Sequence, residues 1–209
     1  MRSLIVCFLF SFTLLVSGAE LPASLKMKNA GNFLWDGISL EYSVVFGNWQ
    51  MPKIAAAQTT KSENNSVTLV SAADFKGVAG EYKTVVTPLG PNRFKIRFTT
   101  EVPAEVKGIQ RYFSVTVPVK QAREIRYQTA KGNGTFVFPE KFDQMALLKQ
   151  PGVTETSLIL TNGEKWIFRS KGRIYVQDNR RFKLNSFNIR FFGNLPCEIE
   201  VERDRKSVV

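Results

Sequence analysis

The segment Ser157–Arg169, SLILTNGEKWIFR, decides the fold class because two β-rich runs flank the dipeptide Asn162-Gly163. Asn-Gly tolerates the positive φ angles of a type I′ turn, and such a turn joins neighbouring antiparallel strands. We therefore predict a hairpin with Ser157–Thr161 in one strand and Lys165–Arg169 in the other. A period of two recurs on both sides of this hairpin, whereas no long segment shows the helical period.

The clearest single strand is Arg93–Phe98. Its apolar side chains at 94, 96 and 98 share one face, and its basic side chains at 93, 95 and 97 share the other. Further strands are predicted at Ile38–Phe46, Val67–Ser71, Tyr82–Thr87, Ile109–Val117, Thr135–Phe138, Ile174–Gln177, Asn188–Phe192 and Glu198–Val201. Strands at roughly ten-residue spacing, separated by turns, predict an all-β antiparallel β-sandwich of jelly-roll or supersandwich-like type.

One segment departs from this pattern. Phe142–Lys149 reads as a short helix that Pro151-Gly152 would end. Around it we expect a single sandwich domain over residues 20–201, with a sub-boundary near residues 139–152 as the alternative. Residues 202–209, ERDRKSVV, read as a charged tail.

The N-terminus carries an export signal. Arg2 precedes the apolar run Leu4–Val16, and the small residues Ser17-Gly18-Ala19 then provide a cleavage site before Glu20. The apolar run is too short to span a membrane, so we predict a signal peptide over residues 1–19 and a secreted or periplasmic protein without a transmembrane segment. Cys7 would leave with the signal, which makes an intrachain disulfide impossible and favours a bacterial source.

Composition excludes several kinds of site. The chain contains no histidine, which rules out Ser-His-Asp and Cys-His catalysis and histidine metal ligands. With Cys197 as the single cysteine after cleavage, the usual zinc sites are excluded as well. We predict no metal, no cofactor and no assigned catalytic residue, and we expect Cys197 to be a buried, unreactive thiol. The formal net charge of +11 favours anionic partners. Nucleic acid is not expected, because the chain is exported and contains no recognisable nucleic-acid-binding motif.

Basic side chains at two-residue spacing are the first candidate ligand site, because such residues project to one face of a strand. Arginine forks suit carboxylate and sulfate groups. The candidates are Arg93, Lys95 and Arg97 on one strand, Arg169, Lys171 and Arg173 on another, and Arg180 in the turn that follows. The alternative for all of them is a solvated outer face of the sheet.

Aromatic and acidic residues supply two further sets of candidates. Trp49, in the loop-like segment Gly47–Pro52, is the best candidate for stacking on a sugar ring, with a core position as the alternative. The other aromatic candidates are Trp35, Trp166, Tyr42, Tyr112, Tyr127 and Tyr175. Glycoside cleavage needs two carboxyl groups across the scissile bond. The carboxyl groups available for it are Asp36, Glu41, Asp143 and Asp178.

Two resemblances follow from these segments. The stretch Ser157–Phe192, together with the strand Arg111–Pro118, resembles the non-catalytic, supersandwich-like modules that precede catalytic domains in secreted bacterial carbohydrate-active enzymes. It covers under half of the chain, and it implies a module that packs against a neighbouring catalytic domain or presents glycan to it. The strand Arg111–Pro118 also resembles the subunit-binding strand of periplasmic pilus chaperones, which implies a protein partner.

The leading hypothesis is therefore a secreted, non-catalytic β-sandwich module that binds or helps process carbohydrate, either acidic or neutral polysaccharide. One alternative is a carboxylate- or Tyr/Lys-dependent polysaccharide hydrolase or lyase. The other is a periplasmic chaperone-like or structural interaction protein.

Overall fold

The computed structural model describes residues 19–47, 49–61, 65–193 and 197–204. The predicted signal peptide therefore lies outside the described residues, apart from Ala19. The described chain consists of strands and one short 3₁₀-helix, η1 (Asn179–Phe182). The strands are β1 (Leu25–Asn29), β2 (Asn32–Trp35), β3 (Ile38–Val45), β4 (Lys53–Ile54), β5 (Gln58–Lys61), β6 (Val67–Asp74), β7 (Ala79–Gly90), β8 (Arg93–Glu101), β9 (Gln110–Pro118), β10 (Ala122–Thr129), β11 (Gly132–Val137), β12 (Ala146–Leu160), β13 (Lys165–Asp178), β14 (Ser186–Phe192) and β15 (Cys197–Asp204).

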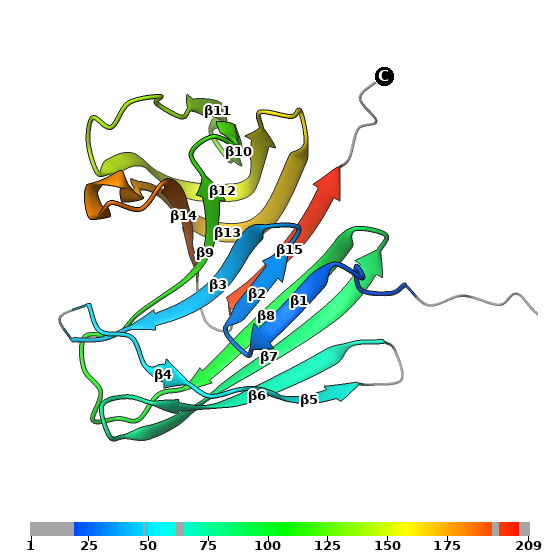
Figure 1. Ribbon diagram of the computed structural model, residues 1–209, viewed down its shortest axis with the longest axis vertical. Helices are drawn as coiled ribbons and strands as arrows, with labels where there is room; N and C mark the ends of the chain where they lie inside the picture. The colour runs from blue at the N-terminus through cyan, green and yellow to red at the C-terminus, as the bar shows by residue number, and fades with distance from the viewer. Residues whose placement is uncertain (1–18, 48, 62–64, 194–196, 205–209) are drawn as a thin grey trace, which may run out of the picture.

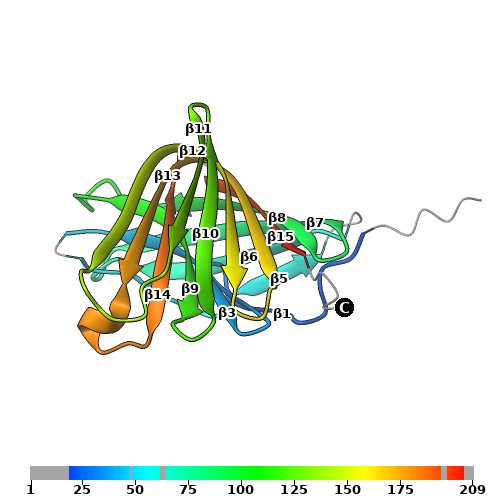
Figure 2. The same cartoon turned by 90° about the horizontal axis from the view of Figure 1, so that it is seen from above.

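Two layers of antiparallel strands face each other (Figure 1). The first layer has the order β1-β2-β3-β9-β14, and the second has the order β15-β8-β7-β6 with β4 and β5 at its edge. Strand β13 pairs with both β14 and β15 and so joins the layers, while β12, β10 and β11 continue the sheet beyond it. Figure 2 shows these last strands arching over one end of the molecule. The predicted all-β antiparallel sandwich is confirmed.

Aromatic rings fill the space between the layers. Tyr42 of β3 stacks on Phe98 of β8 at 4.5 Å between centroids, and Trp35 of β2 lies 5.0 Å from Phe94 of β8. Trp35 also meets Trp166 of β13 edge-on at 4.8 Å. Ring pairs of this kind add to the stabilisation from apolar burial. Trp35 and Trp166, both candidates for stacking on a sugar ring, are fully buried and belong to the core.

The hairpin predicted from Ser157–Arg169 is present as β12 and β13, with Ile159 opposite Lys165. Its turn differs from the predicted type I′, because only Gly163 has a positive φ, of 84°. The amide of Leu160 donates to the carbonyl of Glu164, and the amide of Gly163 donates to the carbonyl of Leu160. This is the three-residue hairpin loop with glycine in the left-handed position.

The helix predicted at Phe142–Lys149 is wrong. Residues 142–145 form a loop, and β12 begins at Ala146, with Leu148 opposite Val176 and Lys149 opposite Tyr175 of β13. Pro151 and Gly152 end no element. They lie where the register of β12 shifts, which is a bulge rather than a stop. Cross-strand partners on β13 outweigh the local helical pattern of this segment.

The charged tail predicted for residues 202–209 is wrong at its beginning. Glu202–Asp204 continue β15 and pair with Lys165–Ile167 of β13. Arg203 forms ion pairs with Asp36 and Glu164, and its guanidinium carbon lies 5.3 Å from the ring centroid of Trp166. The remaining residues, 205–209, lie outside the described residues. The hydrophobic core contains residues from both sides of the segment 139–152.

The layers separate in the middle of β13, at a point that we call the fork. Lys165–Arg169 pair with β15, whereas Arg173–Asp178 pair with β14. Gly172 lies between these stretches, and a Cβ atom at this position would lie 1.8 Å from the carbonyl oxygen of Phe192. The close approach of β13 to the end of β14 therefore requires glycine here.

Candidate functional site

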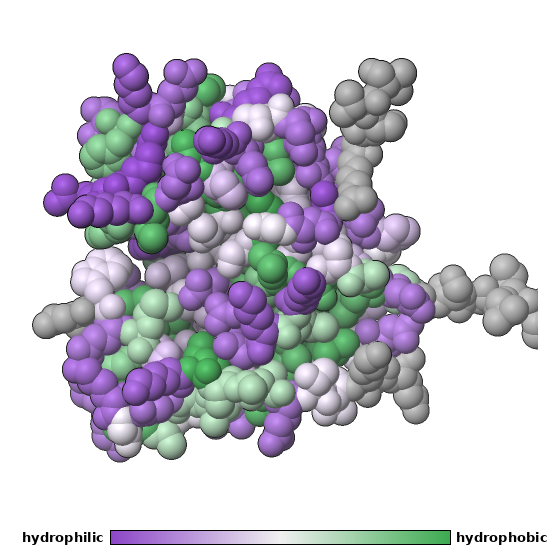
Figure 3. All heavy atoms as spheres, viewed as in Figure 1, coloured by the Kyte–Doolittle hydropathy of each residue, from purple (hydrophilic) through white to green (hydrophobic). Residues whose placement is uncertain are grey.

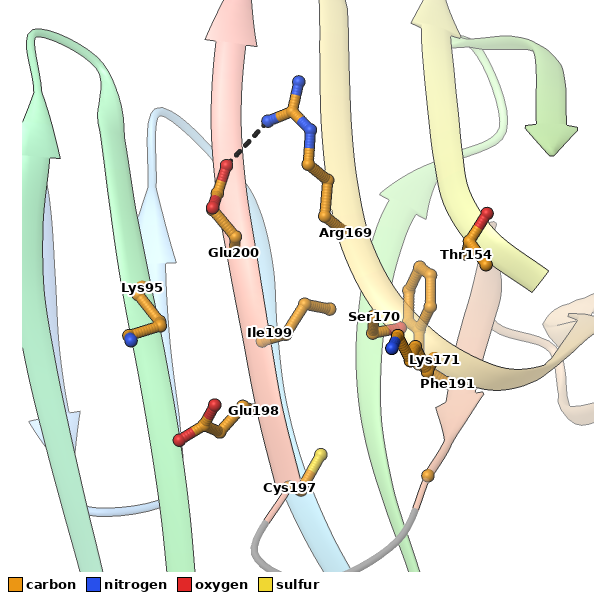
Figure 4. Close-up of a pocket in the computed structure, with 11 residues that line it drawn as sticks. Lys95, Thr154, Arg169, Ser170, Lys171, Phe191, Cys197, Glu198, Ile199 and Glu200 are labelled. Carbon is orange, nitrogen blue, oxygen red and sulfur yellow. Dashed lines mark hydrogen bonds and ion pairs between the residues drawn. The ribbon is translucent and has the colours of Figure 1, made fainter. Parts of the chain in front are cut away.

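A cavity of about 710 Å³ lies at the fork, and we call it the fork cavity (Figure 4). Strands β13 and β15 contribute most of its wall, and single residues of β8, β12 and β14 complete it together with Gly193. The lining residues are Lys95, Thr154, Arg169, Ser170, Lys171, Phe191, Gly193, Cys197, Glu198, Ile199 and Glu200. Its volume falls within the range typical of small-molecule sites.

Strand register explains the charges along this cavity. Arg169 lies opposite Glu200 of β15, and Glu200 lies opposite Lys95 of β8. Glu155 of β12 lies on the other side of Arg169. Acidic and basic side chains thus alternate along one row across four strands, in the arrangement that favours cross-strand ion pairs.

The arginine of this row, Arg169, binds three carboxylates. Its Nε donates to Glu155 at 3.0 Å, and its Nη1 donates to Glu200 at 2.8 Å and to Glu202 at 2.6 Å. Figure 4 shows Arg169 turned toward Glu200. By contrast, neither Lys95 nor Lys171 forms an ion pair with any described residue. The cavity therefore presents the two ammonium groups as hydrogen-bond donors. The carboxylate of Glu198 is a hydrogen-bond acceptor in the same lining.

The floor of the cavity is apolar. Phe191, Ile199 and Cys197 are buried there. Burial raises the pKa of the Cys197 thiol to about 11, and the neighbouring Glu198 contributes to the same shift. The thiol is therefore protonated at neutral pH, which agrees with the predicted unreactive cysteine.

The structure brings together three of the predicted ligand-binding residues: Lys95, Arg169 and Lys171. Arg93 and Arg97 share the outer face of β8 with Lys95, where Arg93 pairs with Glu200 at 2.7 Å and Arg97 with Glu198 at 3.5 Å. Neither Arg93 nor Arg97 lines the cavity, and the other predicted residues outside its lining are Trp49, Arg173 and Arg180. Arg173 lies over the ring of Phe192, with its guanidinium carbon 4.6 Å from the ring centroid. Trp49 is 70% exposed on the turn after β3, so the alternative of a core position is wrong.

Arg180 holds two segments of the protein together. Its Nη2 donates to the carboxylate of Asp178 at 2.6 Å and to the carbonyl of Pro139 at 3.1 Å. Its Nη1 donates to the carbonyl of Glu140 at 2.6 Å. Asp178 is fully buried and also caps η1 by accepting from the amide of Arg180. The hydrogen bond from Arg180 to Asp178 raises the pKa of the guanidinium. Because its donors bind groups of the protein itself, Arg180 has a structural role.

A second polar cluster lies on the outer face of the first layer, away from the core. Arg190 of β14 lies between two rings, with its guanidinium carbon 4.9 Å from the centroid of Tyr112 and 5.7 Å from that of Tyr175. Glu41 of β3 accepts a hydrogen bond from Ser43 at 3.2 Å. Burial raises the pKa of Glu41, while the hydrogen bond from Ser43 and the charge of Arg190 act in the opposite direction.

The sequence offered Glu41, Tyr112 and Tyr175 only as separate candidates. Their proximity depends on the register that places Glu41 opposite Ser114, Ser114 opposite Arg190, and Arg190 opposite Tyr175. The glutamates of the fork cavity had a clearer signal, because Glu198, Glu200 and Glu202 alternate along the chain as Arg93, Lys95 and Arg97 do. Two such complementary strands are expected to pair.

The other carboxylates weighed for catalysis are dispersed. Asp36 pairs with Arg203, Asp178 pairs with Arg180, and Asp143 is exposed on the loop before β12. None of the three lines the fork cavity. Within the described part of the chain, no group of three or more His, Cys, Asp or Glu residues is arranged to hold a metal ion. No helix among the described residues is long and apolar enough to cross a membrane.

Comparisons with known proteins give a distant likeness. No family model matches the chain, and no curated protein matches it significantly. Among solved structures, the chain is similar to one from Escherichia coli K12 described as a "Putative aldose 1-epimerase". The TM-score is 0.49 at 12% sequence identity, over 87% of this chain and 82% of that one. A likeness this distant carries no argument about what the protein binds or catalyses.

Proposed function

We propose that this protein is an exported carbohydrate-binding module and that the fork cavity is its binding site. The ligand class is an acidic polysaccharide, bound without catalysis by this chain. The observation that carries the proposal is the pair Lys95 and Lys171, which line one cavity without ion-pair partners among the described residues. Export through the predicted signal peptide of Met1–Ala19 and a role beside a catalytic domain are parts of the same proposal.

The chemistry of the cavity supports a charged sugar. Carboxylate or sulfate groups would accept hydrogen bonds from Lys95 and Lys171, which are charge-assisted and therefore stronger than neutral ones. Sugar hydroxyl groups both donate and accept, and the cavity provides Glu198 as an acceptor and Thr154 and Ser170 as hydroxyl partners.

Affinity electrophoresis of the purified protein tests this proposal. Gels contain polygalacturonate as a carboxylated ligand, heparin as a sulfated ligand, or dextran as a neutral one. We expect retardation by at least one acidic polymer and a decrease in that retardation as salt screens the charges. Migration unaffected by all three polymers would contradict the proposal.

An enzyme is the second candidate, and the cluster around Glu41 favours it. A partly buried carboxyl group with a raised pKa can act as a general acid, and perturbed groups of this kind gather at active sites. Incubating the protein with the same polymers and measuring new reducing ends separates the two candidates. Chain cleavage that Glu41→Gln abolishes would establish catalysis and overturn the non-catalytic assignment.

A further inference from the structure

Two adjoining segments at one end of the molecule expose large apolar side chains. The loop between β11 and β12 contributes Phe142 and Met145, and the turn around η1 contributes Phe182 and Leu184, all at least a third exposed to solvent. Figures 1 and 2 both show these segments side by side, and in Figure 2 they project beyond the ends of β13 and β14. Solvated loops rarely expose four such side chains without a function.

Hydrogen bonds fix the two segments to each other at both ends of the loop. Arg180 donates to the carbonyls of Pro139 and Glu140 where the loop begins. The amide of Asp178 donates to the carbonyl of Met145 at 2.9 Å where the loop ends. The buried ion pair between Asp178 and Arg180 anchors this arrangement, so the apolar side chains project from a preformed base.

Basic side chains flank the apolar ones. Lys141, Arg181 and Lys183 are exposed on the same two segments, and the acidic side chains exposed there are Glu140 and Asp143. In Figure 3 the upper-left surface, where Figure 1 places η1, shows green spheres between purple ones. We call the four apolar and three basic residues the apolar–basic patch. None of them lines the fork cavity.

We propose that the apolar–basic patch docks the protein onto an anionic lipid bilayer. Phe and Leu side chains on a projecting turn can enter the boundary between headgroups and acyl chains. Lysine and arginine beside them attract anionic headgroups. The three exposed cations outnumber the two exposed carboxylates of the same segments, Glu140 and Asp143, which favours an anionic surface over a neutral one. This surface is separate from the polysaccharide site and does not depend on it.

Co-sedimentation with vesicles tests the docking. One set of vesicles contains phosphatidylcholine alone, and the other contains phosphatidylcholine and phosphatidylglycerol in equal parts. All proteins are produced in the same exported form, so their N-termini are identical. We expect the wild type to bind the anionic vesicles and to leave the neutral ones largely unbound.

Two variants divide the apolar from the electrostatic contribution. K141A/R181A/K183A removes three cations and is expected to weaken binding to anionic vesicles on the order of a hundredfold. F142A/F182A removes two rings and is expected to abolish measurable binding while the cations remain. The matched controls are K26A/K28A/K83A, which removes three exposed lysines from β1 and β7, and Leu89→Ala, which removes an exposed apolar side chain near the end of β7. Both controls should bind as the wild type does.

A fluorescence reading keeps the result independent of folding defects. Phe142→Trp in a Trp49→Phe background places a reporter in the patch, because the remaining tryptophans, Trp35 and Trp166, are buried in the core. Its emission should shift to shorter wavelength with anionic vesicles. Unshifted emission, or patch variants that bind like the wild type, would overturn the proposal. A patch that served a protein partner would give the same negative result. Retardation by polysaccharide should remain unchanged in every patch variant.

Discussion

The η1 turn follows the end of β13, whereas the fork cavity lies at the middle of that strand. Each of these two regions contains a basic residue predicted to bind ligand. At the turn, Arg180 donates to a buried carboxylate and to two carbonyls of the protein. At the fork, Lys171 lines a cavity and has no ion-pair partner among the described residues. A basic residue is available to a ligand only where the protein has not already engaged it, and strand register and burial decide this.

Removing Asp178 should have the largest effect on stability. Asp178→Ala leaves the guanidinium of Arg180 partly buried without its carboxylate and removes the cap of η1. Loss of one partner of a buried pair costs about 3–5 kcal/mol. Urea unfolding measures the change in the free energy of unfolding. Asp178→Asn is the control, because its side-chain oxygen can still accept from the amide of Arg180 and should retain part of the stability. An Asp178→Ala variant as stable as the wild type would show that Arg180 is not structural.

The stability of the fork should depend on how closely β13 and β14 can approach each other rather than on charge. Gly172→Ala places a methyl group against the carbonyl oxygen of Phe192 and forces β13 and β14 apart. Overpacking of this kind costs about 1–3 kcal/mol. Gly163→Ala is a useful comparison, since a Cβ atom there meets nothing within 4 Å and the strain comes only from its positive φ. Equal losses in the two variants would argue against a close approach at the fork.

Glu41 is intermediate between these two situations, because Arg190 is nearby but Glu41 forms no ion pair with a described residue. Because burial raises its pKa, the folded protein binds this proton more tightly than the unfolded chain does. Its contribution to stability is therefore greatest at acidic pH and decreases as pH rises through the folded pKa. The stability of the wild type relative to Glu41→Gln should fall as the pH increases from about 4 toward neutrality. Urea unfolding at a series of pH values measures it, and a pH-independent difference would contradict the assignment.

The exposed ion pair between Arg93 and Glu200, at the edge of the charged row, should matter least for stability. Arg93 is about half exposed and pairs with Glu200, which Arg169 also binds. Arg93→Ala is expected to cost less than about 1 kcal/mol, as is usual for surface ion pairs. The same urea titration measures this change. A loss as large as that of Asp178→Ala would remove the distinction between the two regions.

The sequence predicted the sandwich because its signals are local. Alternation in Arg93–Phe98 and the Asn-Gly hairpin depend on side-chain direction and turn chemistry, and both are present in the structure. The helix at Phe142–Lys149 was wrong because a local pattern competed with partners on β13, nearly thirty residues further along the chain. Pairing over that separation leaves no trace in the segment itself.

The site was harder to predict from the sequence than the fold. The sequence identified Lys95, Arg169 and Lys171 by their spacing, but their meeting in one cavity depends on the break in pairing at Gly172. Arg180 has the same sequence signature as the other cations, and only the burial of Asp178 shows its structural role. The proximity of Glu41 to Arg190 is set by the register of two successive strand pairings, β3 with β9 and β9 with β14.

The central claim is that Lys95 and Lys171 of the fork cavity, which form no ion pair with a described residue, bind acidic polysaccharide. The most direct measurement is the dissociation constant for the acidic polymer, determined by affinity electrophoresis for the variant K95A/K171A. The control is R93A/R97A, which removes the same charge from paired positions on the outer face of β8. We predict that K95A/K171A binds the acidic polymer at least about tenfold more weakly, since each charge-assisted hydrogen bond contributes roughly 1.5–3 kcal/mol before solvent screening. R93A/R97A should remain close to the wild type. Equal weakening in both variants, or none in K95A/K171A, would contradict the account.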